Sequence, residues 1–150
     1  MRIAIASDHA AFEVKAQLVQ WLADNGYHVL DLGPDSPARV DYPDFGYRLA
    51  AALVDKSVER AIALCGSGIG ISMAMNREPK VRCALVSEPL SAALAREHND
   101  ANALAMGARL IGLDMAQACI TAFLHTDFAA GRHAARVDKL AHPPTLPNVV

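Results

Sequence analysis

A glycine-rich stretch carries the clearest chemical signal in the sequence. It reads Cys65-Gly66-Ser67-Gly68-Ile69-Gly70 and precedes an expected helix. Three glycines in five positions let the backbone approach a ligand closely, so that successive N–H groups line one concavity. The helix N-terminus adds partial positive charge, and such a setting favours the reactive thiolate of Cys65. We therefore expect a ligand-binding loop; the alternative is a glycine-rich turn beside a buried, inert cysteine.

Two further polar groups could take part in the same chemistry. Asp8 and His9 follow a short apolar run, and adjacent residues on an extended chain point in opposite directions, so they need different roles. The alternative for Asp8 is a helix cap. The run Glu97-His98-Asn99-Asp100 lies before the last apolar run, where the alternative is a solvated turn.

Three arginines are candidates for binding an anion. Arg132 and Arg136 are spaced i, i+4, so on a helix they share one face and can grip a phosphate as bidentate donors. Arg109 follows the glycine that ends the last apolar run. For all three the alternative is ordinary surface charge.

The sequence lacks the motifs of several other functional classes. Its six histidines and three cysteines show no HExxH or CxxC spacing, so we expect no metal site. A GxSxG elbow and a GxxxxGK[ST] phosphate loop are also absent, which disfavours a serine hydrolase and an NTPase.

The elements that must position these residues alternate along the chain. Apolar runs at Arg2–Ser7, His28–Leu32, Arg60–Cys65, Val81–Val86 and Asn102–Met106 predict five strands, with helical stretches between them. This alternation predicts a Rossmann-like, three-layer α/β/α sandwich with a five-stranded parallel sheet. Ligands bind beyond the carboxyl ends of such strands, which is where the glycine loop, Asp8 and Arg109 fall.

Local signals define the helices. Gly26 is expected to end the first helix, and Pro43 to lie in the first turn of the second. Ser87 is expected to open a later helix whose inner face carries Leu90 and Leu94. The next helix should bury one face, made of Met115, Cys119 and Phe123. A basic helical turn is expected from Arg132 to about Leu140.

Composition limits the class of protein. The 150 residues are 53% apolar and 20% charged with a net charge of −2, which indicates one folded domain over 1–150 without a nucleic-acid or membrane-surface footprint. No apolar run approaches the roughly 18–20 residues of a membrane span, and a charge comes too early for a signal peptide. Three cysteines, an odd number, indicate a reduced, cytoplasmic chain. Residues 143–150 form a Pro-rich tail.

Taken together, the motifs resemble one family, the type B ribose-5-phosphate isomerases, which also contains galactose-6-phosphate and allose-6-phosphate isomerases. The resemblance covers residues 1 to about 140. It rests on Ser7-Asp8-His9-Ala10, Asp41-Tyr42-Pro43, the glycine loop continued to Ile71-Ser72, Ser87-Glu88-Pro89, Arg96 to Asn102, and Gly131-Arg132-His133 with Arg136-Val137. It implies strand order 2-1-3-5-4, an enzyme of carbohydrate metabolism in the pentose phosphate pathway, and a homodimer or homotetramer whose sites are shared between subunits.

The resemblance also implies catalytic roles. Cys65 would take the proton from C2 of the sugar and return it to C1. The amides of Gly66–Gly70, helped by Ser67, would hold the enediolate oxygen, and His98 with Asp8 would open the sugar ring. This proton transfer is redox-neutral, so it requires no nicotinamide, flavin or metal.

The implied substrate contacts involve the remaining polar candidates. Asn99 and Tyr42 would contact sugar hydroxyls. The phosphate would be bound by His9, Arg109, Arg132 and Arg136, the last two supplied by the neighbouring subunit.

Two departures from the family pattern leave alternatives open. One branch has a Glu base where this chain has Ile71, which cannot ionise, so Cys65 must be the base here. Many ribose-specific members have an aromatic residue in place of Leu90. Ribose 5-phosphate is the expected substrate; allose 6-phosphate, galactose 6-phosphate and a tetrose 4-phosphate are alternatives, as is a non-catalytic sugar-phosphate-binding subunit.

Overall fold

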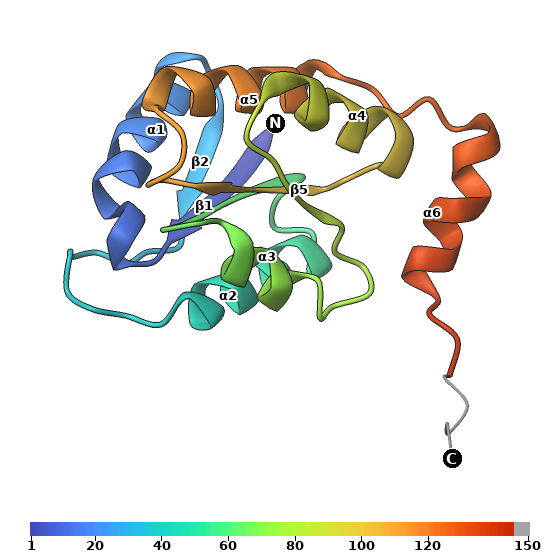
Figure 1. Ribbon diagram of the computed structural model, residues 1–150, viewed down its shortest axis with the longest axis horizontal. Coiled ribbons are helices and arrows are strands. Elements are labelled where there is room, and N and C mark those ends of the chain that lie inside the picture. Colours follow the sequence, from blue (N-terminus) through green and yellow to red (C-terminus); the bar gives the residue numbers. More distant parts are fainter. Residues whose placement is uncertain (146–150) are drawn as a thin grey trace.

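The computed structural model describes residues 1–145, in which five parallel strands form one sheet between two layers of helices (Figure 1). The sheet order is β2-β1-β3-β5-β4, as predicted. Its strands are β1 (Arg2–Ser7), β2 (His28–Asp31), β3 (Arg60–Cys65), β4 (Cys83–Leu85) and β5 (Ala103–Gly107). The register pairs Ser7 with Leu64 and Cys65 with Gly107, so β1, β3 and β5 end at one edge of the sheet.

Helices cover both faces of this sheet (Figure 1). One layer holds α1 (Phe12–Asp24), α4 (Pro89–Asn99) and α5 (Leu113–His125), and the other holds α2 (Tyr42–Val54) and α3 (Ile69–Met75). Short 3₁₀ turns, η1 (His9–Ala11) and η2 (Gly131–His133), precede α1 and α6 (Ala134–Ala141). None of the helices found in residues 1–145 combines the length and apolarity that crossing a bilayer requires.

The two faces of the sheet carry side chains of different size. Strand residues facing α1, α4 and α5 are large, and include Ile3, Ile5, Ile62, Leu64, Leu104 and Met106. Those facing α2 and α3 are Ala4, Ala6, Ala61, Ala63, Ala103 and Ala105. Small side chains let α2 and α3 approach the sheet closely. The strand alanines thus lie beneath the two helices nearest the glycine loop.

Several predicted boundaries are confirmed. Gly26 follows the end of α1 with φ +84°, a conformation that favours glycine. Pro43 lies in the first turn of α2, where a missing N–H leaves no hydrogen bond unmade. The strand predicted over Val81–Val86 is shorter, Cys83–Leu85, because it forms the edge of the sheet and pairs only with β5.

Predictions for α4 were wrong in two respects. Leu90 and Leu94 are 65% and 36% exposed, whereas Ala92, Ala95 and Arg96 are buried. The alanines recur at helical spacing and allow close packing of α4 on α5, so this small-residue face is turned inward. The helix cap is Glu88 rather than Ser87, because the Glu88 carboxylate accepts hydrogen bonds from the N–H groups of Leu90 and Ser91, both at 2.6 Å.

The predicted inner face of α5 is correct in part. Cys119 and Phe123 are fully buried, as expected, but Met115 is 41% exposed. Ala116 and Ile120 complete the buried stripe instead. The stripe therefore follows i, i+3, i+4 and i+7 from Ala116, one position later than the apolar pattern indicated.

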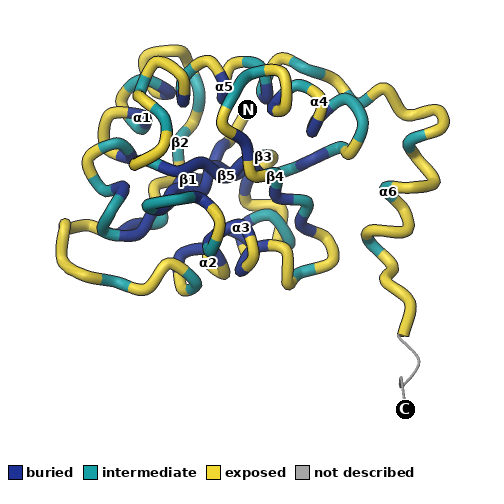
Figure 2. Tube along the Cα trace, viewed as in Figure 1, coloured by how far each residue is buried: buried dark blue, intermediate teal, exposed yellow. Residues whose placement is uncertain are grey.

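The chain ends in an arm formed by η2 and α6. Figures 1 and 2 show α6 running away from the α/β body, with an almost entirely exposed surface. The predicted basic helix is thus present, although it begins with a 3₁₀ turn. Of the predicted Pro-rich tail, residues 143–145 have no helix or strand, and residues 146–150 lie outside the described residues.

Candidate active site

A cavity of about 360 Å³ opens at the carboxyl edge of the sheet. It is formed where β1, β3 and β5 end and α2 begins, as the rule for parallel sheets predicts. We call the predicted site residues gathered here the carboxyl-edge cluster: Asp8, His9, Tyr42, Cys65, Gly66, Ser67, Gly70 and Arg109. The cavity is lined by Asp8, Tyr42, Cys65, Gly66, Ser67, Gly70, Arg109 and Leu110.

The glycine loop folds tightly around the Cys65 thiol. The Gly68 N–H donates to Cys65 Sγ at 3.0 Å, and the Ile69 N–H donates to Ser67 Oγ at 3.3 Å. Gly68 has φ +76°, and a Cβ there would lie 2.6 Å from Leu85 Cδ1, so only glycine fits. The amides of Gly66, Ser67 and Gly70 donate to no group within residues 1–145, which leaves them available to a ligand oxygen.

Cys65 is the only one of the three cysteines at this cavity. Burial raises the pKa of the Cys83 thiol to about 12. Burial, followed by the nearby charge of Glu88, also raises the pKa of Cys119. Both are therefore neutral thiols at physiological pH, as expected for cysteines that only fill the core.

Asp8 both caps a helical turn and reaches the cavity. Its carboxylate accepts a hydrogen bond from the Ala10 N–H at 3.0 Å, so the capping alternative is confirmed. The residue is only 7% exposed, yet it lines the cavity. His9 points differently: its Nδ1 lies 3.1 Å from the carbonyl oxygen of Val40, in the loop that leads to Tyr42.

Tyr42 lies over the last glycine of the loop. A Cβ on Gly70 would lie 2.6 Å from Cε2 and Cζ of the Tyr42 ring, so this approach requires a residue without a side chain. Arg109 closes another side of the cavity. Its backbone N–H donates to the Gly66 carbonyl at 3.1 Å, and its side chain is exposed.

The other predicted site residues gather elsewhere. His98 stacks on His133, with ring centroids 4.4 Å apart and an interplanar angle of 7°. Partial burial of the ring lowers the pKa of His133, and repulsion from His98, Arg132 and Arg136 lowers it further. We call the group of His98, Asn99, Arg132, His133 and Arg136 the amino-edge cluster.

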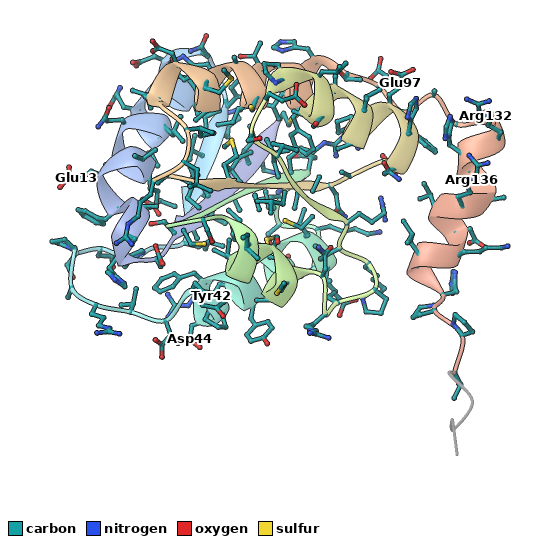
Figure 3. All side chains as sticks on the ribbon, viewed as in Figure 1. Glu13, Tyr42, Asp44, Glu97, Arg132 and Arg136 are labelled. Atoms are coloured by element: carbon teal, nitrogen blue, oxygen red, sulfur yellow. The ribbon has the colours of Figure 1, made fainter. Side chains whose placement is uncertain are left out.

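This second cluster lies at the opposite edge of the sheet. The Asn99 carbonyl accepts a hydrogen bond from Arg82, which directly precedes β4. The Asn102 carbonyl accepts one from Ala61, the second residue of β3. The six residues of β3 span about 16 Å at roughly 3.3 Å per residue. Figure 3 accordingly shows Arg132 and Arg136 far from Tyr42. The structure therefore does not bring His98 together with Asp8 within one chain.

His133 is a member of this cluster that the sequence interpretation did not include. Its stacking partner lies 35 positions earlier, on α4, so no helical spacing relates the two residues. The sequence feature that could have indicated His133 is its position between Arg132 and Arg136, two candidate phosphate ligands. Arg132 belongs to η2 and Arg136 to α6, so the regular i, i+4 geometry assumed for them is interrupted by the 3₁₀ turn.

The part of the chain that the structure describes holds no evident metal site. Within residues 1–145, no three His, Cys, Asp or Glu side chains gather closely enough to hold an ion. The polar groups at the cavity are instead an acid, a thiol, backbone amides and a guanidinium. Such a set can move protons and stabilise an oxyanion.

Comparisons with known proteins give the relatives of the whole chain. The profile of the ribose/galactose isomerase family matches residues 3–140. "Ribose-5-phosphate isomerase B" of Escherichia coli is 40% identical over 139 residues, 93% of each chain. A "D-erythrulose-4-phosphate isomerase" of Pectobacterium atrosepticum is 36% identical over 143 residues, covering 95% of this chain and 94% of the other. The structure of Clostridium thermocellum ribose-5-phosphate isomerase B superposes with a TM-score of 0.93 at 42% identity, covering 94% of this chain and 95% of that one.

Proposed function

The chain belongs to the ribose/galactose isomerase family, and on that premise we propose that it interconverts D-ribose 5-phosphate and D-ribulose 5-phosphate as a single isomerase domain. The observation that carries the proposal is the position of Cys65. Its sulfur lies at the cavity beside backbone amides that are free to bind an oxygen. The three buried, unpaired cysteines further support a cytoplasmic compartment.

In this mechanism Cys65 is the base. As thiolate it takes the proton from C2 of the open-chain aldose, and the electrons move toward the C1 oxygen to form an enediolate. The proton of the C2 hydroxyl passes to the C1 oxygen, which leaves the negative charge on the C2 oxygen. As the C2 oxygen forms the carbonyl, the protonated thiol delivers its proton to C1, and the product is the ketose. A positioned base of this kind contributes about 10²–10⁴-fold. The amides of Gly66, Ser67 and Gly70, with Ser67 Oγ, hold the developing negative oxygen, at about 3 kcal/mol per donor in comparable sites.

The cyclic sugar must first open, and we assign that step to His98 with Asp8. One group removes the proton of the anomeric hydroxyl while the other protonates the ring oxygen. The two lie at opposite edges of the sheet in one chain, so the pair must form between chains. Asn99 and Tyr42 then contact the sugar hydroxyls.

The phosphate is assigned to groups from both clusters. His9 and Arg109 come from the chain that supplies Cys65, whereas Arg132 and Arg136 come from its neighbour. The exposed arm, which carries both arginines away from its own body, supports this exchange (Figure 3). We therefore propose a homodimer, or a homotetramer built from such dimers, in which each site takes one cluster from each subunit.

Turnover of purified protein tests this function. Ribose 5-phosphate, allose 6-phosphate, galactose 6-phosphate and erythrose 4-phosphate are compared by kcat/KM. The proposal expects the highest value for ribose 5-phosphate, and a protein that binds these sugars without converting any is a non-catalytic subunit. His98→Asn serves as an internal control, because it should abolish enzymatic ring opening only.

A tetrose 4-phosphate is the second candidate substrate. The 36% identical D-erythrulose-4-phosphate isomerase favours it, and Leu90, in place of an aromatic residue, leaves the identity of the substrate open. A tetrose whose 4-hydroxyl is phosphorylated cannot close a furanose ring, so its isomerisation needs no ring opening. If that is the substrate, His98→Asn leaves turnover of the tetrose phosphate nearly unchanged.

A further inference from the structure

A bridge of two arginines and one aspartate, in which Arg96 is buried and the other two are half-buried, adjoins the amino-edge cluster at Asn99. Arg82 Nη2 donates to Asp100 Oδ2 at 2.9 Å, and Arg96 Nη1 donates to Asp100 Oδ1 at 2.7 Å. The side chains of Arg96, Arg82 and Asp100 are 6%, 17% and 33% exposed. None of the three residues lines the cavity that holds Cys65. We call this group the Arg82–Asp100–Arg96 bridge.

The bridge fixes the backbone that carries His98 and Asn99. Arg82 Nε donates to the carbonyl of Asn99 at 3.1 Å and to that of Asp100 at 2.9 Å. On the other side, Arg96 Nη1 donates to the carbonyl of Ala101 at 2.7 Å. Arg82 and Arg96 thus both bind the backbone at the end of α4, and the Asp100 carboxylate links the two guanidinium groups.

The same bridge anchors the root of the arm. Arg96 Nε donates to the Thr126 carbonyl at 3.4 Å, just after α5, and its guanidinium carbon lies 5.9 Å from the centre of the Phe123 ring. Three residues later, the Ala129 N–H donates to the Glu97 carbonyl at 3.0 Å. These contacts tie the segment leading to His133 to the end of α4, where the two histidine rings stack.

A helix stop alone does not account for an aspartate at this position. Asp100 has φ +45°, in the left-handed region that glycine adopts without strain. Glycine would end α4 equally well, but it would leave the buried Arg96 and the half-buried Arg82 without their shared carboxylate. The carboxylate therefore adds what a glycine cannot, a link between the two guanidinium groups and the backbone segments that they hold.

We propose that Arg82, Asp100 and Arg96 are positioning residues for ring opening. They set His98 and Asn99, and the arm beside them, at the geometry needed in the neighbouring subunit's cavity. The inference rests on the proposed function, in which His98 opens the ring. It assigns a role to a group of three charged residues that lies outside the cavity holding Cys65.

The test uses Asp100→Gly in the full-length oligomer. Glycine suits φ +45° and removes only the carboxylate, so the backbone path is preserved. Lys56→Gly is the matched control: Lys56 also follows a helix with positive φ, +64°, but at the end of α2, where its carbonyl accepts a hydrogen bond from Arg2 and not from a bridge residue. Asp100→Asn, which also tolerates this conformation and keeps one acceptor oxygen, provides a milder variant.

The measurement is the initial rate as a function of enzyme concentration, starting from ribose 5-phosphate or from ribulose 5-phosphate. The equilibrium constant fixes the ratio of the two kcat/KM values, so their ratio alone cannot reveal a ring-opening defect. An enzyme that cannot open the ring depends on spontaneous opening in solution, and its rate from ribose 5-phosphate then reaches a plateau as enzyme is added. The rate from ribulose 5-phosphate, which has no furanose to open, stays proportional to enzyme.

We expect the plateau for His98→Asn and Asp100→Gly, a plateau reached only at higher enzyme concentration for Asp100→Asn, and none for wild type or Lys56→Gly. At low enzyme, Asp100→Gly should lose at least tenfold in kcat/KM. Thermal unfolding of each variant is measured in parallel, and Asp100→Asn carries the test if Asp100→Gly fails to fold.

The outcomes separate the two proposals. Proportional rates in both directions for the Asp100 variants, beside a plateau for His98→Asn, overturn the positioning role and leave the function intact. If His98→Asn shows no plateau while wild type is active, ring opening belongs to another group and the positioning role falls with it. A wild-type protein that isomerises no sugar phosphate overturns both.

Discussion

Mixing two inactive variants should restore activity, because the two clusters cannot meet within one chain. The first variant, Cys65→Ala, lacks the base at the carboxyl edge. The second, Arg132→Ala/Arg136→Ala, lacks the phosphate ligands of the arm. If each site takes one cluster from each subunit, a mixed dimer has one site with both lesions and one with neither.

The expected recovery follows from counting sites. After random exchange of equal amounts, a site draws an intact member of each cluster with a probability of one half, so about one quarter of all sites are intact. Heterodimers purified through two different affinity tags should reach about one half of the wild-type site concentration. A site contained in one chain gives no recovery, because every chain carries a lesion.

The assay follows ketose formation at a substrate concentration well below the wild-type KM. Loss of one charged hydrogen bond to phosphate, worth about 1.5–3 kcal/mol, raises KM by one to two orders of magnitude. The double arginine variant loses both ligands and is therefore nearly silent there. Subunit exchange is verified by native mass spectrometry. Verified heterodimers with no more activity than the two parents would refute the shared site, and the 16 Å separation would then need a movement of the arm within one chain.

Four further predictions concern single features. Cys65→Ala should lose at least about 100-fold in kcat while titration calorimetry shows nearly unchanged sugar-phosphate binding, and substantial residual kcat would assign the base elsewhere. Gly70→Ala should displace the Tyr42 ring and raise KM with little change in Tm, and adding this change to Tyr42→Ala should have no further effect; additive losses would contradict the contact. Hydrogen bonds from Ser91, and then from Leu90, lower the pKa of Glu88 below its ordinary 4.5. The Tm of wild type should therefore exceed that of Glu88→Gln by its full amount above pH 4.5, and the difference should disappear as the pH falls through the lower pKa of the folded state. A Tm difference that does not depend on pH would exclude this cap. Treatment with EDTA should leave the rate unchanged, and a loss would reveal a required metal.

The sequence predicted the fold well because its signals are local. Turn residues such as Gly26 and Pro43 act within a few positions, and the alternation of apolar runs with helical stretches determines a parallel sheet almost by itself. The errors arose where two apolar patterns competed on one helix. In α4 the leucines at 90 and 94 suggested one inner face and the alanines another, and close packing against α5 selected the alanines.

The site was predictable to the extent that it follows the strands. Asp8 directly follows β1, Cys65 ends β3 and Arg109 lies two residues after β5, so their meeting at one edge could be deduced from strand order. The stacking of His98 on His133 could not, because it depends on how the arm leaves α5. Membership of the family, expected from the motifs, is confirmed by the comparisons, but the motifs did not indicate that His98 and Asp8 lie at opposite edges.

The direction of α4 explains why the two clusters are separate. A helix that connects parallel strands runs back along the sheet, so α4 begins near the carboxyl edge at Glu88 and ends near the amino edge at Asn99. Its 11 residues cover about 16 Å at 1.5 Å per residue, nearly the length of β3. A group at the end of α4 therefore cannot reach the cavity at the end of β3 without unwinding the fold. In the mechanism proposed above, His98 can open the ring only if another copy of the chain presents its cavity to that edge, so that mechanism makes association a condition of ring opening.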